Sequence, residues 1–202
     1  VELVFHGGHI RCEPDDPIIG GQVRLVQPFF PNEVLTQYAI PRGLAGSGGD
    51  PADRGTWRSY EGLDDAIARI QEAMRREAPI DAVFGFSQGS NLLTILSAQA
   101  ASGRGADFRC AIHDGTSLPG WIADYPELFR APLSVPAMII HGEQDTNALG
   151  GDEIAALYDP VFVERRMHSS DHRPLPKDPQ EAKGLAQDIL KFLLRHCRGA
   201  SA

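Results

Sequence analysis

A pentapeptide near the middle of the chain, Gly85-Phe86-Ser87-Gln88-Gly89, has the residue types of a nucleophilic serine site. It matches G-x-S-x-G, in which the serine occupies a strained turn and small flanking residues let a strand and a helix approach closely. The pattern alone is weak evidence in a chain with 21 glycines. Its context is stronger, because an apolar run precedes Ser87 and an apolar helical segment follows it. We therefore predict that Ser87 is the nucleophile of a serine hydrolase.

A serine hydroxyl becomes a good nucleophile only when a histidine takes its proton and an acid orients that histidine. In α/β hydrolases the chain order is serine, acid, histidine. Asp145 follows an apolar segment that ends at Ile140, and loops at strand ends carry function in such sheets. Asp145 is the predicted acid, with Asp114 and Asp152 as its rivals.

Two histidines compete for the role of base in the sequence His168-Ser-Ser-Asp-His172. We favour His172, because the segment is longest and most polar there and Pro174 and Pro176 follow to fix the backbone. His168 lies nearer to the predicted strand end, and we expect it to hydrogen-bond within the loop.

The negative charge that forms during acyl transfer needs two amide donors. By position these are the amides of Gln88, next to the nucleophile, and Gly8, in a His-Gly-Gly segment whose glycines free the backbone. The spacing of His6 and His9 could suggest a metal site, but no carboxylate or thiolate cluster accompanies them. We expect no metal and no cofactor.

These residues must be positioned by a fold in which short apolar runs alternate with segments of helical period. This alternation predicts a mostly parallel sheet with helices on both faces, in one α/β domain over residues 1–202. The stretch 9–22 contains Pro14 and Pro17 and is expected to be a loop, as is the glycine-rich stretch 43–53. Predicted strands cover 1–5, 23–26, 81–86, 108–112, 137–140 and 161–163, and predicted helices begin near 63, 91 and 179.

The start of the last predicted helix has its own signal. Asp178 is placed to cap it, Pro179 suits the first turn, and Glu181 completes the pattern of a capping box.

The composition excludes several kinds of partner. The formal net charge is −8, which repels nucleic acid and anionic lipid, and no apolar run approaches the roughly 20 residues of a membrane span. Cys12, Cys110 and Cys197 are far apart and form no C-x-x-C pair. They fit plain thiols in a reducing compartment, and no secretory signal is visible, so we expect a cytoplasmic protein.

The chain resembles the FSH family of serine hydrolases. The resemblance is carried in order by the segment 80–90 around Phe-Ser-Gln-Gly, by His-Gly-Glu-Gln-Asp-Thr at 141–146, and by the histidine pair. It implies a compact α/β-hydrolase fold with little or no cap, carboxylesterase or thioesterase activity, and Ser87, Asp145 and His172 as the catalytic triad. The chain departs from the family after His6-Gly7 and at 113–115, where His-Asp-Gly replaces a small turn.

The predicted reaction is acyl transfer in two steps on a small-molecule ester or thioester, with an acyl-enzyme at Ser87. An acyltransferase with the same triad and a non-catalytic ligand receptor remain alternatives, and the oligomeric state is not predicted. Bulky residues in loops at or after strand ends are candidates for the substrate pocket: Phe29, Phe30, Trp57, Leu118 and Trp121.

Overall fold

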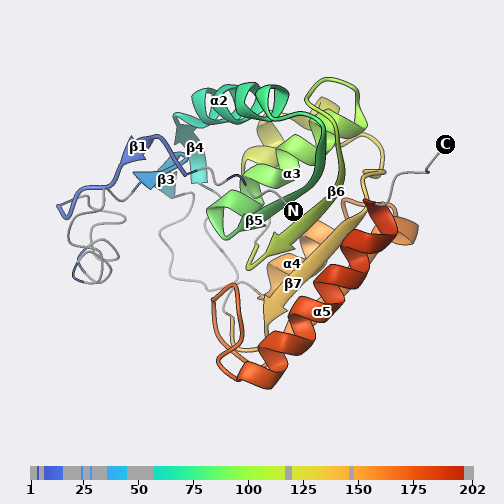
Figure 1. Cartoon of the computed structure of the whole chain (residues 1–202). Coiled ribbons are helices and arrows are strands. Elements are labelled where there is room, and N and C mark those ends of the chain that lie inside the picture. Colours follow the sequence, from blue (N-terminus) through green and yellow to red (C-terminus); the bar gives the residue numbers. More distant parts are fainter. Residues whose placement is uncertain are drawn as a thin grey trace. The chain divides into compact units, whose positions relative to one another are not determined.

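The computed structural model describes residues 4, 7–15, 24, 28, 36–44, 57–116, 120–145 and 148–197. The chain divides into two compact units, Val1–Ile70 and Gln71–Ala202 (Figure 1). The single domain over residues 1–202 stays a prediction.

The first unit contains two short antiparallel pairs. Strand β1 (Ile10–Arg11) pairs with β2 (Thr36–Gln37), and β3 (Ile40–Leu44) pairs with β4 (Trp57–Glu61). The predicted strands 1–5 and 23–26 lie mostly outside the described residues, as does most of the predicted loop 43–53.

Helix α2 (Leu63–Arg76) begins in the first unit and ends in the second. It is amphipathic, and apolar side chains on one face, including Leu63, Ile67 and Met74, are buried. Acids in its first turn and Arg75 and Arg76 in its last turn agree with the helix dipole. The predicted helix at this place is confirmed.

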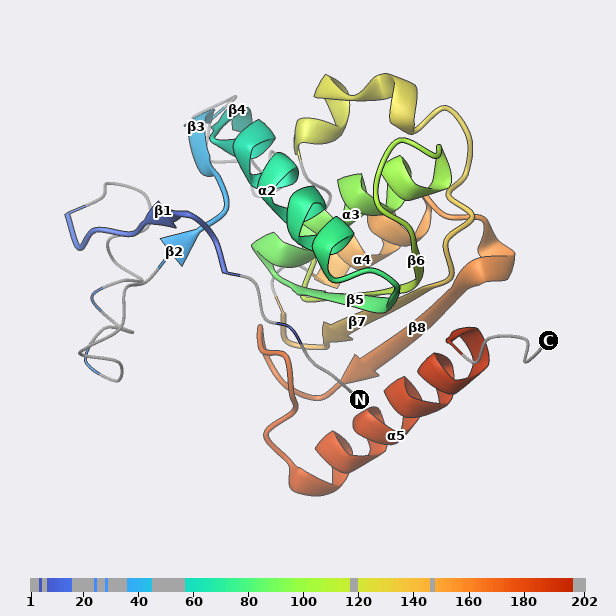
Figure 2. The ribbon, with the colours of Figure 1, turned by 45° about the horizontal axis from the view of Figure 1, so that its top comes forward.

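The second unit is built on a parallel sheet of four strands in the order β5-β6-β7-β8. These strands are β5 (Ile80–Phe86), β6 (Phe108–Asp114), β7 (Ala137–Gly142) and β8 (Val163–His168) (Figure 2). Strand β7 is buried along its whole length, as expected of a strand with neighbours on both sides and helices on both faces. The predicted α/β fold class is confirmed.

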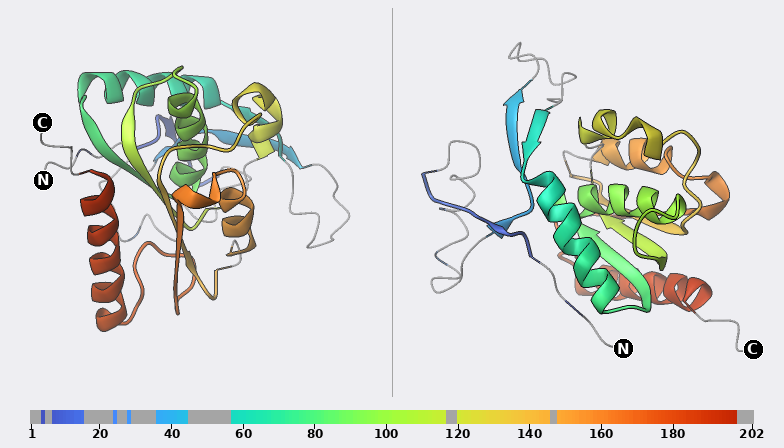
Figure 3. Two further views of the ribbon diagram at one scale, coloured as in Figure 1. Left: turned by 90° about the vertical axis from the view of Figure 1, so that its right-hand side faces the viewer. Right: turned by 90° about the horizontal axis from the view of Figure 1, so that it is seen from above.

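Three helices cover this sheet: α3 (Gln88–Ala101) and α4 (Ala148–Ala155) on one face, and α5 (Pro179–His196) on the other (Figure 3). On the α5 face, Leu185 and Phe192 pack in one core cluster with side chains that include Cys110, Ile112 and Ile140. Short 3-10 helices at Gly120–Asp124 and Pro126–Leu128 lie between β6 and β7. Within the described ranges, no helix is long and apolar enough to cross a membrane.

The last strand differs from its prediction. Residues 161 and 162 belong to a 3-10 helix, Pro160–Phe162, and β8 begins at Val163. The cause is local, because the Asp159 side chain accepts a hydrogen bond from the Val161 amide at 3.1 Å and caps the turn.

Candidate active site

Ser87 lies on the sharp turn between β5 and α3. Its backbone has φ 52° and ψ −119°, an unusual conformation for a residue other than glycine. A Cβ atom at Gly85 would lie 2.6 Å from the Gly89 carbonyl oxygen, so only glycine lets the helix begin this close to the strand. The predicted strained turn is confirmed. It holds the hydroxyl of Ser87 at the carboxyl end of the sheet, beside the first turn of α3.

Ser87, His172 and Asp145 form a continuous chain of hydrogen bonds. Ser87 Oγ lies 3.0 Å from His172 Nε2, and His172 Nδ1 lies 2.8 Å from Asp145 Oδ2. Because a carboxylate can only accept, Nδ1 donates to Asp145, which leaves Nε2 to accept from the serine hydroxyl. The exposed fraction falls from 35% for the His172 side chain to 1% for that of Asp145. The chain therefore runs from an accessible serine to a buried acid.

Backbone contacts between two loops set the distance between the acid and the histidine. The amides of Glu143 and Gln144 donate to the carbonyls of His168 and Ser170, at 2.8 and 3.1 Å. A Cβ atom at Gly142 would lie 2.2 Å from the Ser170 carbonyl oxygen, so this close approach requires glycine. The loop after β7 and the loop after β8 thus form one connected support.

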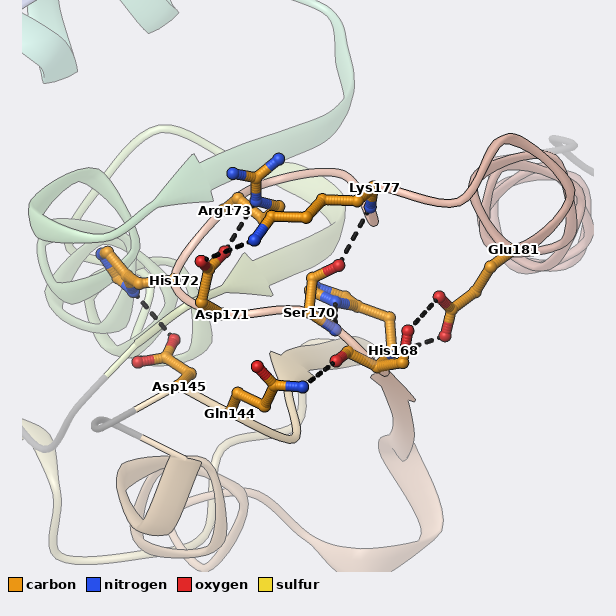
Figure 4. Close-up of polar contacts among 10 residues, drawn as sticks. Gln144, Asp145, His168, Ser170, Asp171, His172, Arg173, Lys177 and Glu181 are labelled. Atoms are coloured by element: carbon orange, nitrogen blue, oxygen red, sulfur yellow. Dashed lines mark hydrogen bonds and ion pairs between the residues drawn. The ribbon is translucent and has the colours of Figure 1, made fainter.

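Charged side chains stiffen the loop that carries His172 (Figure 4). Asp171 accepts from Arg173 at 2.7 Å and from Lys177 at 3.1 Å, and these hydrogen bonds lower its pKa to about 2. The Ser170 hydroxyl accepts from the Lys177 amide at 2.9 Å. The loop is thereby closed on itself on either side of His172.

The helix that follows the loop anchors its other end. Asp178 caps α5 as predicted, accepting from the Gln180 and Glu181 amides at 3.0 and 2.8 Å. Glu181 does not complete a capping box. Its carboxylate accepts from the Ser169 amide at 2.7 Å and from the Ser169 hydroxyl at 2.6 Å, and these bonds lower its pKa. The carboxylate therefore ties α5 to the start of the loop.

His168 has the structural role predicted for it. It is the last residue of β8, its side chain is buried, and its Nδ1 accepts from the Ser170 amide at 3.3 Å. His172, and not His168, is the histidine within hydrogen-bonding distance of Ser87.

Comparison with known families identifies the class. A family model described as serine hydrolase (FSH1) matches residues 47–180. The chain belongs to this family of serine hydrolases. The match includes all three members of the hydrogen-bonded chain.

The family's curated relatives include esterases. The chain is 26% identical over 142 residues to Esterase OVCA2 of Xenopus tropicalis, covering 67% of this chain and 59% of that protein. It is 29% identical over 86 residues to the human Esterase OVCA2, covering 42% and 38%. The chain thus spans between 38% and 59% of the length of these relatives. A fungal esterase structure from Rhizomucor miehei superposes with a TM-score of 0.49 at 17% identity, over 65% of this chain and 59% of that one.

The rival acids of this family member lie in different settings. Asp152, on α4, is exposed and forms an ion pair with Arg165. Asp114, the last residue of β6, is buried, and burial and then the charge of Asp145 raise its pKa to about 7. Its neighbour His113 is buried between Ser90 and Tyr158, and burial lowers its pKa to about 3.

Other residues singled out in this serine hydrolase stay predictions. Gln88 begins α3, and Gly8 lies in the first unit against the backbone of Gln37. Trp121 is 2% exposed in a 3-10 helix, and the backbone of Trp57 begins β4. Three pocket candidates lie outside the described residues: Phe29, Phe30 and Leu118. Among the residues that the structure describes, no three or more His, Cys, Asp or Glu side chains gather in a group that could hold a metal ion.

Proposed function

We propose that this chain hydrolyses carboxylic ester or thioester bonds of small acyl substrates, with Ser87, His172 and Asp145 as its catalytic triad. The main support is the continuous chain of hydrogen bonds, 3.0 Å from Ser87 to His172 and 2.8 Å from His172 to Asp145. Membership of a serine hydrolase family and relatives named as esterases favour the same chemistry.

The reaction begins when Ser87 Oγ attacks the carbonyl carbon of the substrate while its proton passes to His172 Nε2. Asp145 accepts from Nδ1 throughout, so it holds the ring in place and stabilises the imidazolium that forms. His172 then donates the proton to the departing alcohol or thiol, which leaves an acyl group on Ser87. A water molecule, deprotonated by His172, attacks the acyl-enzyme and releases the acid.

Negative charge on the substrate oxygen is stabilised by backbone amides in this proposal. The Gln88 amide opens the 14-residue helix α3, whose N-terminal dipole favours an anion at that place. The sequence also suggests the Gly8 amide as a second donor.

The setting of two cysteines suggests where the protein works. The sulfurs of Cys110 and Cys197 lie 3.5 Å apart as free thiols, within hydrogen-bonding distance of each other. Because neighbouring thiols tend to oxidise outside reducing compartments, we propose a cytoplasmic location.

A fluorophosphonate probe tests the nucleophile. We expect the wild-type chain to be labelled, Ser87→Ala to lose all labelling, and Ser102→Ala, at the far end of α3, to be labelled like the wild type. Labelling of folded Ser87→Ala at the wild-type rate would overturn the proposal.

Matched substrates then test the bond that is cleaved. The wild-type chain and Ser87→Ala are assayed with p-nitrophenyl esters of increasing acyl length and with thioesters of the same acyl groups, using a thiol reagent as readout. We expect hydrolysis that depends on Ser87, and the ratio of kcat/KM between the two series gives the preferred leaving group. Adding an alcohol or amine acceptor and measuring its acylation separates a hydrolase from an acyltransferase.

A further inference from the structure

Asp114 is a buried carboxyl group with no hydrogen-bond partner in the part of the chain that the structure describes. Its exposed fraction is 1%, and among the described residues neither carboxyl oxygen has a partner. An ionised carboxylate left without donors in such a place is costly, because burial removes the water that would solvate it. A structural role would normally come with hydrogen bonds. None of the reaction steps described above uses this residue.

Several immediate neighbours of Asp114 belong to the candidate active site. The Ser87 amide donates to the Asp114 carbonyl at 2.9 Å. Phe86 is paired with Asp114 across the sheet, and its ring centroid lies 4.9 Å from that of His172. A Cβ atom at Gly115 would lie 2.9 Å from His172 Cε1. The end of β6 therefore lies directly beside the imidazole that serves as the base.

The side chain of Asp114 lies on the α5 face of the sheet. Cys110 and Ile112 pack with Leu185 and Phe192 of α5, and side chains of a strand alternate between its two faces. Asp114 comes two residues after Ile112 on the same strand, so its side chain points to the same face. It is therefore on the same face as the loop 169–178, which leads from β8 into α5.

The charges around Asp114 oppose its ionisation. Asp145, on the loop after β7, is negatively charged when it accepts from His172, and it acts with burial to raise the pKa of Asp114. The charged groups of the loop itself pair with one another, and at the start of α5 Asp178 accepts from backbone amides and Glu181 from Ser169. The titratable and charged groups on the surrounding elements include His141, Asp145, His168, Asp171, His172, Arg173, Lys177 and Glu181.

We propose that Asp114 is a positioning residue for His172: a buried carboxyl group that leaves the ring neutral while it is protonated and, once ionised, raises the pH at which the ring can act as a base. This inference rests on the proposed function. A protonated Asp114 leaves Asp145 as the one negative charge beside the ring, so His172 can stay neutral and accept the proton of Ser87. If Asp114 loses its proton, two carboxylates share the site, and both favour an imidazolium that cannot act as a base.

The test is the dependence of kcat/KM on pH. Asp114→Asn has nearly the shape of the protonated acid and cannot ionise. Asp81→Asn is the matched control, because it removes an exposed acid that pairs with Arg109 at the opposite end of β5. Relative to each protein's own plateau, we expect the rise of kcat/KM in Asp114→Asn to lie about one pH unit lower than in the wild type. We also expect the pH dependence of kcat/KM in Asp114→Asn to fit the ionisation of one group. Asp81→Asn should superpose on the wild type.

A purely structural role for Asp114 would lower thermal stability and leave the position of the rise unchanged, and that result would overturn the inference. Should Asp114→Asn fail to fold, Asp114→Ser takes its place. Infrared spectra of the wild type add a measurement that needs no variant. A band of a protonated carboxyl should be present near pH 6 and lost near pH 8, on either side of the pKa of about 7. Its absence would also overturn the inference.

The two proposals can fail separately. Labelling and turnover that persist in Ser87→Ala would reject the proposed function. Loss of both in Ser87→Ala, together with coincident profiles for Asp114→Asn and the wild type, would reject only the role of Asp114.

Discussion

His113 and Asp114, adjacent residues at the end of β6, are both buried but differ in the hydrogen bonding of their side chains. His113 faces α3, and both its ring nitrogens are bonded, to Ser90 Oγ at 3.1 Å and to Tyr158 Oη at 2.7 Å. Asp114 faces α5, and neither of its oxygens has a hydrogen-bond partner in the described structure. Two consecutive residues of one strand thus carry a buried side chain with hydrogen-bond partners and, among the described residues, a buried side chain without them.

The difference separates two uses of a buried polar residue. The bonded histidine joins β6 to α3 and to Tyr158, and its contribution is to stability. The unbonded carboxyl costs stability unless it stays protonated, and the next residue, Gly115, lies against the ring of His172. A buried polar group that costs stability is typical of functional sites. Variants of these residues and of the neighbouring acids can distinguish a stabilising role from a functional one.

The largest effect is expected at Asp145. Asp145→Asn removes the negative charge that orients His172 and stabilises its protonated form, so kcat should fall by about 10⁴ with little loss of folding. Asp152→Asn is the control, because Asp152 pairs with Arg165 on the surface, and its activity should match the wild type. Steady-state kinetics and thermal melts of both variants provide the measurement. If Asp145→Asn stays active and Asp114→Asn does not, Asp114 is the acid and the division drawn here is wrong.

The sequence points to the three residues of the proposed triad because they follow strands. Ser87, Asp145 and His172 each come after an apolar run, and the carboxyl ends of parallel strands meet at one edge of the sheet. Their chain order then limits the possible pairings. The distances of 3.0 and 2.8 Å confirm that these three side chains meet.

Contacts between distant segments could not be predicted in this way. Glu181 has the spacing of a capping box, but Ser169 competes for its carboxylate from twelve residues away. Similarly, Asp114 and Asp145 both follow apolar strands and look alike in the sequence. Burial without hydrogen-bond donors among the described residues distinguishes Asp114, and this setting exists only in the folded chain. The signal available beforehand was its departure from the small turn of related chains.

His113 and Asp114 should give stability opposite dependences on pH. The pKa of His113 is lowered to about 3, so between about pH 6.5 and 3 the unfolded chain binds a proton that the folded chain refuses. Acid therefore lowers the free energy of unfolding through His113. The pKa of Asp114 is raised to about 7, so between about pH 4 and 7 the folded chain keeps a proton that the unfolded chain releases. Rising pH therefore lowers stability through Asp114, and each contribution reaches at most about 5 kcal/mol.

Urea unfolding of variants at a series of pH values measures these slopes. Asp114→Asn should gain stability relative to the wild type as the pH rises from about 4 to 7. His113→Gln should gain relative to the wild type as the pH falls from about 6.5 to 3. A constant difference across the range, for either variant, would show that the residue does not titrate as described.

The smallest effect is expected at Tyr158. Tyr158→Phe removes the hydroxyl that bonds His113 and leaves a buried ring nitrogen unsatisfied, which should cost about 1 to 2 kcal/mol of unfolding free energy. The plateau of kcat/KM should change less than two-fold, because the hydroxyl acts on the α3 face, away from the loop that carries His172. A double-mutant cycle with His113→Leu isolates the bond between Tyr158 and His113, because the Ser90 hydroxyl loses His113 equally in the single and the double variant. A large loss of activity in Tyr158→Phe without loss of stability would contradict a purely stabilising role for His113. His113 would then act in function, as proposed for Asp114.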